Sequence, residues 1–325
     1  MPEVLGDIAS MNTTDRVAVC SRSFSRNETL RSELLSRYSH VTFNDEGLSL
    51  KGDSLIEFLK GHGKAITALE KLDEYVLSQL PDLKVIGKYG VGLDMINMSA
   101  MKRYGKRLGW TGGVNKRSVS ELVISFAVTL LRHVPAAQRE VLAGTWRQHV
   151  GGHLSGRTVG IVGCGHIGKD LVKMLQPFGC PVLVNDIRDY SDFYSEYGIE
   201  AVGLEELLAK SDVVSLHVPL DDSTVNMLTA DRLSLMKPTA ILINAARGGL
   251  LDEQALKTML IEKRLAAAAL DVFSVEPPTD YELLELPNFL VTPHIGGSAE
   301  EAILAMGRSA IDGLDDHQNV EEIIY

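Results

Sequence analysis

The chain has 325 residues, of which 45% are hydrophobic, and its formal net charge is −11. This length predicts two domains, and the hydrophobic content is sufficient for two packed cores. The acidic balance and the lack of a Lys/Arg cluster argue against nucleic-acid binding, which needs a basic face, but not against a small anionic substrate.

Apolar runs stay well below the roughly 18 residues that a membrane span needs, so we expect no membrane contact. The N-terminal stretch Met1 to Thr14 has no signal-peptide pattern, and we expect it to be loosely ordered. Three cysteines, Cys20, Cys164 and Cys180, are too few and too scattered for a disulfide framework or a zinc cluster. We therefore expect no metal site and a reducing, cytoplasmic location.

Short apolar runs recur between polar or helical stretches in the first third of the chain, which predicts a β/α domain. The runs are Val17–Cys20, Val41–Phe43, Ala65–Thr67, Val85–Gly87 and Leu108–Trp110. From Ser118 to His133 apolar residues then repeat at helical spacing, and we expect a long helix that crosses between the domains.

The middle of the chain contains the glycine loop Gly163-Cys164-Gly165-His166-Ile167-Gly168, between the apolar run Thr158–Val162 and a helical pattern that stops at Gly179. This order predicts strand, tight turn and helix, as in a dinucleotide-binding unit. Gly163 allows the turn, Gly165 lets a pyrophosphate approach, and Gly168 lets the helix pack on the strand. We expect the pyrophosphate over the helix N-terminus, near the backbone of His166 and Ile167.

Asp186 follows the next apolar run, Pro181–Asn185, close to the distance at which such a unit places the carboxylate for the adenosine ribose. A purely structural glycine turn does not explain this acid. A carboxylate here accepts hydrogen bonds from a ribose 2′-OH and repels a 2′-phosphate, so NAD is favoured over NADP. Arg188 keeps NADP open, because an arginine nearby can accommodate the phosphate.

Further strand candidates follow, and with the two already placed they predict six parallel strands. They are Val213–Leu216, Ala240–Ile243, Ala267–Leu270 and Phe289–Val291. A last helix, from Ser298 to about Gly313, is expected to return to the first domain. The predicted fold is α/β, with two Rossmann-like domains built on doubly wound parallel sheets. Residues 117–294 would form the NAD-binding domain, and residues 1–116 and 295–325 a discontinuous substrate domain.

Three segments place an ionisable residue at or just past a strand end, where open α/β sheets bind their ligands. They are Asn244–Asp252, Leu270–Pro278 and Thr292–Gly297. Together with the glycine loop, Tyr89–Asp94, Gly113–Asn115 and Ser120-Glu121, their order resembles the D-isomer-specific 2-hydroxyacid dehydrogenases over nearly the whole chain.

The resemblance implies that Arg247 anchors the substrate, that His294 is the acid/base and that Glu276 is its partner. Imidazole can take and return the hydroxyl proton near neutral pH, and a nearby carboxylate favours its protonated form and holds its orientation. The planar guanidinium suits a carboxylate and polarises a carbonyl. Taken singly, the three residues could be a structural histidine, a turn glutamate and a surface charge, but those readings do not predict all three at successive strand ends.

Other site residues also follow from the resemblance. Asp271 would accept a hydrogen bond from the nicotinamide carboxamide, although a helix N-cap is the alternative. Gly90, Val91 and Gly92 would bind the substrate carboxylate through backbone N–H groups, unless they form only a flexible turn. Ala245 and His217 would line the cofactor pocket, and for His217 a packed core histidine is equally consistent.

The expected substrate is a small 2-hydroxy acid or its 2-oxo partner, bound in the cleft between the domains. Lys88–Gly92 and His294–Ser298 look most like phosphoglycerate dehydrogenases, so the resemblance favours 3-phosphoglycerate and phosphohydroxypyruvate as the substrate pair. Ala68-Leu69-Glu70, however, has no cation before Lys71 to bind a phosphate. Because the chain ends at Tyr325, we expect neither the C-terminal regulatory domain of longer phosphoglycerate dehydrogenases nor control by serine through it.

Several alternatives stay open. The enzyme could reduce glyoxylate, hydroxypyruvate or another 2-oxo acid, or oxidise formate or phosphite. A protein of another class, an NADH-sensing corepressor, uses the same fold for binding and assembly. The resemblance also implies a homodimer formed around Ser118–Trp146.

Overall fold

The computed structural model describes residues 16–323, so the expectation for Met1–Thr14 lies outside the described residues. The chain forms two compact units: unit 1 runs to Asn115 and resumes at Glu300, and unit 2 is Lys116–Ala299. The second boundary thus falls at residue 300 rather than at the expected 295. Residues 295–299 stay with unit 2 because the Asp271 carboxylate accepts hydrogen bonds from the Ile295 and Gly296 amides, each at 2.7 Å.

Unit 1 is built on a 6-stranded sheet in the order β13-β5-β4-β3-β1-β2. All neighbours are parallel except β13, which pairs antiparallel with β5. The order β2-β1-β3-β4-β5 is that of flavodoxin-like sheets. The strands are β1 (Val17–Val19), β2 (Val41–Phe43), β3 (Lys64–Thr67), β4 (Val85–Lys88), β5 (Arg107–Gly109) and β13 (Gln318–Asn319).

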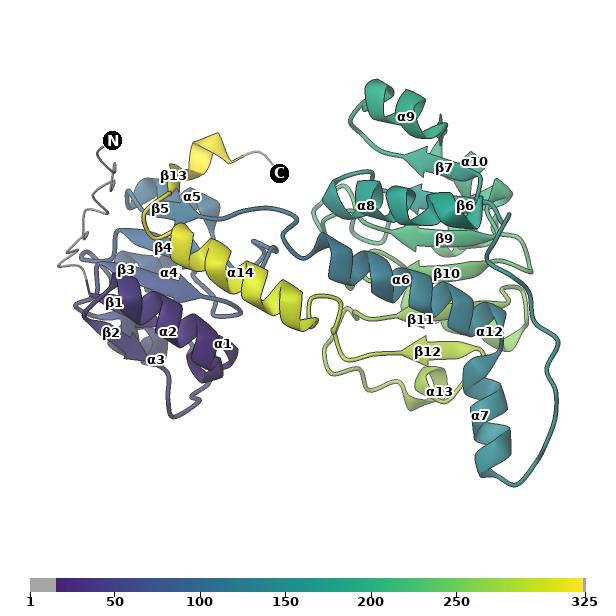
Figure 1. Ribbon diagram of the computed structural model, residues 1–325, viewed down its shortest axis with the longest axis horizontal. Helices are drawn as coiled ribbons and strands as arrows, with labels where there is room; N and C mark the ends of the chain where they lie inside the picture. The colour runs from purple at the N-terminus through teal and green to yellow at the C-terminus, as the bar shows by residue number, and fades with distance from the viewer. Residues whose placement is uncertain (1–15, 324–325) are drawn as a thin grey trace, which may run out of the picture. The chain divides into compact units, whose positions relative to one another are not determined.

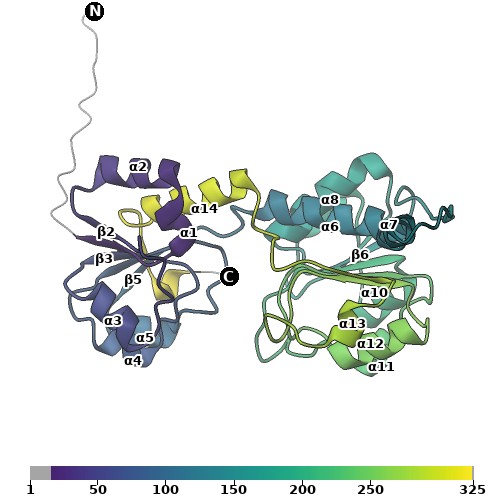
Figure 2. The same cartoon turned by 90° about the horizontal axis from the view of Figure 1, so that it is seen from below.

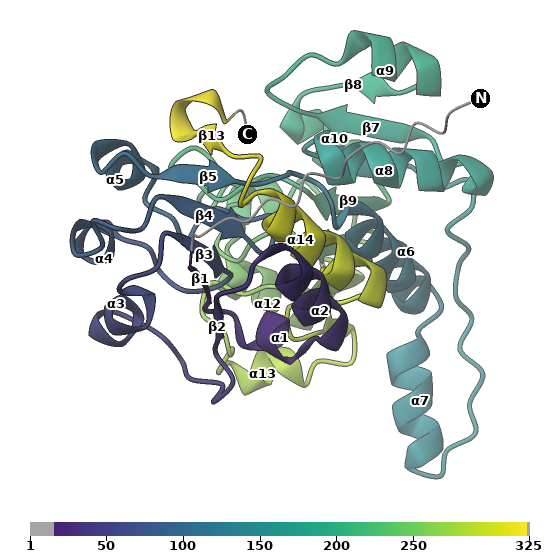
Figure 3. The ribbon, with the colours of Figure 1, turned by 60° about the vertical axis from the view of Figure 1, so that its left-hand side comes forward.

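Helices cover both faces of this sheet (Figures 2 and 3). One face carries α1 (Arg22–Arg26), α2 (Glu28–Arg37) and α14 (Glu300–Asp312), and the other carries α3 (Asp53–Leu59), α4 (Glu74–Ser78) and α5 (Met98–Arg103). The C-terminal helix α14 is part of this core. A Cβ added at Gly87 of β4 would lie 2.3 Å from the Ala310 carbonyl oxygen, so glycine permits the close approach of α14 to the sheet.

Unit 2 is built on a 7-stranded sheet, all parallel, in the order β12-β11-β10-β9-β6-β7-β8. This is the doubly wound dinucleotide-binding order with one strand added. The strands are β6 (Val159–Val162), β7 (Val182–Asn185), β8 (Glu200–Ala201), β9 (Val213–Leu216), β10 (Ile241–Asn244), β11 (Ala267–Leu270) and β12 (Phe289–Val291). The prediction of six strands missed β8, whose two exposed residues give no apolar signal.

The central strands β6, β9, β10 and β11 are buried along their whole length, as expected for a sheet covered on both faces. Figure 2 shows α6 and α8 on one face and α10 to α13 on the other. Helix α9 lies beside β7 in Figure 1 and beside β8 in Figure 3. The bounds are α6 (Lys116–Leu131), α8 (His166–Leu175), α9 (Ser191–Tyr197), α10 (Leu204–Lys210), α11 (Ala230–Leu233), α12 (Glu253–Ile261) and α13 (Tyr281–Leu284).

Helix α7 (Val134–Leu142) differs from the other long helices of unit 2, because none of its residues is buried. It extends away from the body of the unit in Figure 3. Within residues 16–323 no single helix is long and apolar enough to cross a membrane. Helices α6 and α7 taken together have the length and composition of a membrane span, but they are bent by 61° relative to each other.

Candidate active site and coenzyme site

The glycine loop after β6 has the geometry of a pyrophosphate cradle. Gly163 has φ 98°, a left-handed conformation that favours glycine, and a Cβ there would lie 2.6 Å from the His217 carbonyl oxygen. A Cβ on Gly168 would lie 2.2 Å from the Gly163 carbonyl oxygen, so this glycine lets α8 pack on the turn. A Cβ on Gly165 would meet nothing within 4 Å. The loop is therefore open at the position where a coenzyme pyrophosphate would approach.

The N-terminus of α8 lies directly behind this opening. Its N-cap, Gly165, makes no side-chain cap, and the helix begins at His166 and includes Ile167. Burial, with the charges of Lys116 and Lys169, lowers the pKa of His166, which favours a neutral imidazole. Attraction for an anion here comes from the helix N–H groups and the helix dipole rather than from a charged histidine.

Asp186, directly after β7, faces the glycine loop. Its Oδ2 accepts a hydrogen bond from the Cys164 amide at 2.5 Å, and its Oδ1 accepts one from the Arg188 amide at 2.8 Å. Each carboxylate oxygen has a second acceptor position, which a ribose hydroxyl can use. The residues present thus fit the adenosine half of a dinucleotide.

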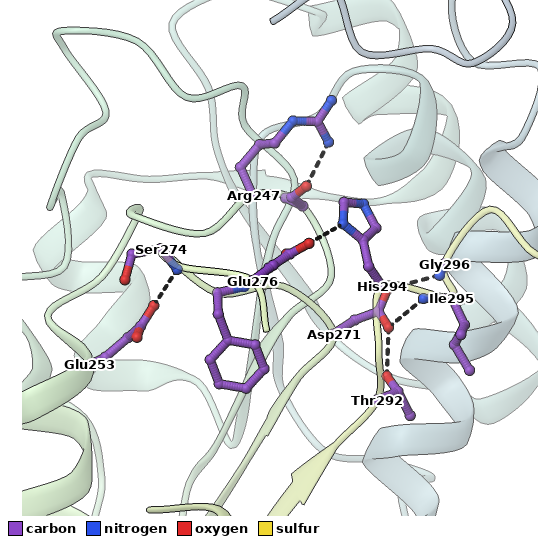
Figure 4. Close-up of polar contacts among 11 residues, drawn as sticks. Arg247, Glu253, Asp271, Ser274, Glu276, Thr292, His294, Ile295 and Gly296 are labelled. Carbon is purple, nitrogen blue, oxygen red and sulfur yellow. Dashed lines mark hydrogen bonds and ion pairs between the residues drawn. The ribbon is translucent and has the colours of Figure 1, made fainter. Parts of the chain in front are cut away.

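His294 and Glu276 form a hydrogen-bonded pair at the carboxyl edge of the same sheet (Figure 4). His294 Nδ1 lies 3.0 Å from Glu276 Oε2, and Glu276 Oε1 accepts a hydrogen bond from the Phe273 amide at 3.1 Å. The two side chains are 48% and 39% exposed, so the pair is accessible to a substrate. Because Nδ1 is directed at Glu276, Nε2 is the ring nitrogen that can exchange a proton with a substrate.

The loop that carries His294 is fixed by Asp271, which is 1% exposed at the end of β11. Its Oδ1 accepts hydrogen bonds from Thr292 Oγ1 at 2.5 Å and from the Ile295 amide at 2.7 Å, and its Oδ2 accepts one from the Gly296 amide at 2.7 Å. His294 itself has φ 55°, which is costly for a residue with a side chain. These hydrogen bonds hold the backbone in that conformation.

Arg247 lies in the turn after β10, on the side of the sheet where Figure 4 shows Glu276 and His294. Asn244 shapes this turn: its Nδ2 donates to the Arg247 carbonyl oxygen at 2.8 Å, and its Oδ1 accepts from the Ala246 amide at 3.1 Å. The guanidinium Nη1 donates to the Ala246 carbonyl oxygen at 2.7 Å. The sequence motif therefore does bring the three ionisable residues into one region of unit 2.

A cavity of about 430 Å³ adjoins the histidine pair. Its wall combines the polar groups of the pair with proline and other apolar side chains. The lining residues are Asp271, Phe273, Glu276, Pro277, Pro278, Val291, Thr292, Pro293 and His294.

His217 and Ala245 lie at neighbouring strand ends. His217 Nε2 is 2.8 Å from Ser215 Oγ, and its Nδ1 is buried with no hydrogen-bond partner among the described residues. Burial lowers the pKa of His217 to about 3, so this imidazole is neutral at ordinary pH. Ala245 is 7% exposed, directly after β10.

In unit 1 the loops after β3 and β4 are joined by backbone and side-chain contacts. The Tyr89 amide donates to the Thr67 carbonyl oxygen at 2.8 Å, and the buried Lys88 places its Nζ 2.5 Å from the Ala68 carbonyl oxygen. Gly90 has φ 120°, and Trp110 Nε1 donates to the Val91 carbonyl oxygen at 2.9 Å, next to Gly92. The loop after β4 thus contacts both the loop after β3 and Trp110.

Sequence reasoning passed over Asn244 and Thr292, which make the hydrogen bonds that shape the Arg247 and His294 loops. The only available signal was their place inside the two motifs. Within residues 16–323, no group of three or more His, Cys, Asp or Glu side chains is arranged to hold a metal ion.

Comparison with known proteins agrees with this geometry. Residues 124–296 match the model of the NAD-binding domain of D-isomer specific 2-hydroxyacid dehydrogenases. The chain is 38% identical to D-3-phosphoglycerate dehydrogenase of Methanocaldococcus jannaschii over 73% of this chain and 46% of that protein. It is 35% identical to hydroxypyruvate reductase of Thermotoga maritima, over 76% and 81% of the two chains.

A solved structure with the same fold is D-lactate dehydrogenase from Aquifex aeolicus complexed with NAD and lactic acid. It has a TM-score of 0.79 and 26% identity, covering 93% of this chain and 94% of that one. The chain spans about half the length of the phosphoglycerate dehydrogenase relative but most of the hydroxypyruvate reductase. With its NAD-binding domain matched and its fold shared, this protein belongs to the D-isomer specific 2-hydroxyacid dehydrogenase family.

Proposed function

We propose that the protein is an NAD-dependent dehydrogenase that interconverts a small D-2-hydroxy acid and its 2-oxo acid. The observation that carries the proposal is the pairing of His294 with Glu276 at a sheet edge that also presents Arg247. The loop Gly163–Gly168 and Asp186 would hold NAD, which when bound would accept or supply the hydride.

In this reaction His294 Nε2 takes the hydroxyl proton during oxidation and returns a proton to the carbonyl oxygen during reduction. Glu276 holds the imidazole in the orientation needed for that exchange and favours its protonated form. Arg247 binds the substrate carboxylate and polarises the carbonyl, since a guanidinium offers two parallel donors. The backbone amides of Gly90–Gly92, in unit 1, are further donors suited to a carboxylate.

The test is turnover in His294→Ala and Arg247→Ala, with NADH affinity measured on the same preparations. Loss of a general acid/base costs about 10²–10⁴ in rate, so activity should nearly vanish while NADH still binds. His40→Ala and Arg264→Ala, both at exposed positions, are matched controls and should keep full activity. Full activity in either site variant would contradict the assignment, as would failure of every 2-oxo acid to oxidise NADH.

For the substrate, we propose an unphosphorylated 2-oxo acid such as hydroxypyruvate or glyoxylate over phosphohydroxypyruvate. Lys88 is only 4% exposed, and its ammonium group donates to the Ala68 carbonyl oxygen. Glu70 places a carboxylate at the same loop, where its Oε2 accepts a hydrogen bond from the Ala68 amide at 2.6 Å. A carboxylate repels a phosphate dianion, and the similarity to hydroxypyruvate reductase over 81% of that protein also favours this class.

A panel of glyoxylate, hydroxypyruvate, pyruvate, phosphohydroxypyruvate and branched 2-oxo acids, each with NADH and NADPH, tests both substrate and coenzyme. We expect hydroxypyruvate to exceed phosphohydroxypyruvate in kcat/KM and NADH to exceed NADPH. A higher kcat/KM for phosphohydroxypyruvate than for hydroxypyruvate would instead support a phosphoglycerate dehydrogenase. A preference for NADPH over NADH would indicate that Arg188 binds a 2′-phosphate.

We also propose that the protein is a cytoplasmic homodimer that associates through the surface of α7 and the segment after it. This surface exposes large apolar side chains: Val134, Val141, Leu142, Trp146 and Val150, from 47% to 93% exposed. Such a patch is typical of an interface. Light scattering should give a dimer that Leu142→Asp dissociates, and a monomeric wild type would refute the dimer. The location is supported by Cys20, Cys164 and Cys180, all buried free thiols.

A further inference from the structure

The turn that carries Glu276 is exposed. After the buried Phe273, residues 274–277 are all on the surface. A surface turn and a partly exposed carboxylate have several accessible conformations, so keeping Oε2 at 3.0 Å from His294 Nδ1 requires the turn to be held from outside.

Two contacts from the segment after β10 hold it. Gly248 lies so close to Phe273 that an added Cβ would be 1.9 Å from the Phe273 carbonyl oxygen. Glu253, the first residue of α12, accepts a hydrogen bond through its Oε1 from the Ser274 amide at 2.8 Å (Figure 4). The Glu276 carboxylate in turn accepts from the adjoining Phe273 amide at 3.1 Å.

We infer that Glu253 is a positioning residue, which holds the turn 273–276 so that Glu276 can orient His294; the inference rests on the proposed function. A hydrogen bond from an amide to an ionised carboxylate is stronger than one between neutral groups. Glu253 acts on the Glu276 side chain through two consecutive amides, those of Ser274 and Phe273.

The arrangement also links the two substrate-facing segments. Glu253 begins α12, directly after the connection from β10 that carries Arg247, so its hydrogen bond to Ser274 ties this connection to the Glu276 turn. The N-cap of α12 is Asp252, which accepts from the Ala255 amide at 2.9 Å. Removal of the Glu253 side chain therefore leaves the helix cap intact and loosens the turn alone.

The experiment compares Glu253→Ala with Glu253→Gln in the full chain. Misplacement of an orienting group lowers kcat, so we expect about a tenfold loss in Glu253→Ala with the KM for NADH unchanged. Glu253→Gln keeps an oxygen that can accept from Ser274 and should recover most of the loss. Glu262→Ala, at the other end of α12 beside Arg264, is the matched control and should behave as wild type.

A double-mutant cycle with Glu276→Gln separates positioning from general destabilisation. If Glu253 acts through Glu276, Glu253→Ala causes little further loss in the Glu276→Gln background. Imidazole NMR of the coenzyme-free protein gives a readout without turnover: the Nδ1–H resonance of His294 should exchange faster in Glu253→Ala. Equal losses in both Glu253 variants, or fully additive losses in the cycle, would overturn the inference. If the wild type turns over no 2-oxo acid but the His294 Nδ1–H resonance still exchanges faster in Glu253→Ala, the proposed function alone is refuted.

Discussion

Replacement of Asp271 by Asn should loosen the loop that carries His294. The wild-type carboxylate accepts three hydrogen bonds, from Thr292 Oγ1 and the Ile295 amide on Oδ1 and from the Gly296 amide on Oδ2. An asparagine has one oxygen and one NH₂ group. In its better orientation the oxygen keeps the two donors at Oδ1, and the NH₂ group faces the Gly296 N–H with no acceptor between them.

The magnitude follows from this count. One hydrogen bond to a charged group, about 1.5–3 kcal/mol, is lost, and the two that remain become weaker because the acceptor is neutral. Removing a buried charge returns part of that cost. We expect a net decrease of about 2 kcal/mol in the free energy of unfolding of unit 2. Thr292→Val removes one hydrogen-bond donor, while Asp271 keeps its charge and its two amide donors. This variant should lower the free energy of unfolding by about 1 kcal/mol.

Urea unfolding of both variants measures these differences, and amide hydrogen exchange locates them. The Ile295 and Gly296 amides should lose protection in Asp271→Asn, and kcat should fall because His294 is no longer held at its backbone φ of 55°. The reasoning is refuted if the Gly296 amide keeps its wild-type protection, or if Asp271→Asn is as stable as the wild type.

Two further predictions concern the coenzyme half of the site. Gly168→Ala should destabilise unit 2 by about 1–3 kcal/mol, because the new Cβ would meet the Gly163 carbonyl oxygen at 2.2 Å, whereas Gly165→Ala should keep stability and weaken NADH binding; thermal melts and NADH titration check the contrast, and equal stability of the two variants would count against it. For His217, the pKa of about 3 in the folded state lies below the ordinary value of 6.5, so the unfolded chain takes up the proton first and stability falls as the pH drops from 6.5 toward 3. At pH 5 the free energy of unfolding is about 2 kcal/mol lower than at neutral pH. Unfolding measured at several pH values should show a weaker pH dependence of this free energy in His217→Gln than in the wild type. The same pH dependence in both proteins would show that His217 is not the titrating group.

Local signals in the sequence were sufficient for most elements. The runs at Val213–Leu216 and Ala267–Leu270 became β9 and β11 with the expected bounds, because strands buried on both faces must be apolar throughout. The short strand β8 was missed because its two residues, Glu200 and Ala201, are exposed and give no apolar signal, although they pair with β7. The boundary at residue 295 was wrong because Asp271 holds the following residues to unit 2.

The sequence by itself determined which residue types stand at the strand ends: the glycines after β6, Arg247 after β10, Glu276 after β11 and His294 after β12. Their order along the chain was enough to indicate a dinucleotide and an acid/base. Only the tertiary structure decided how these groups are held. The strands β10, β11 and β12 are neighbours both along the chain and in the sheet, whereas β6 pairs with β9, which is distant in the chain. Contacts such as Gly163 with His217 and Glu253 with Ser274 therefore arise from long-range packing that no local pattern encodes.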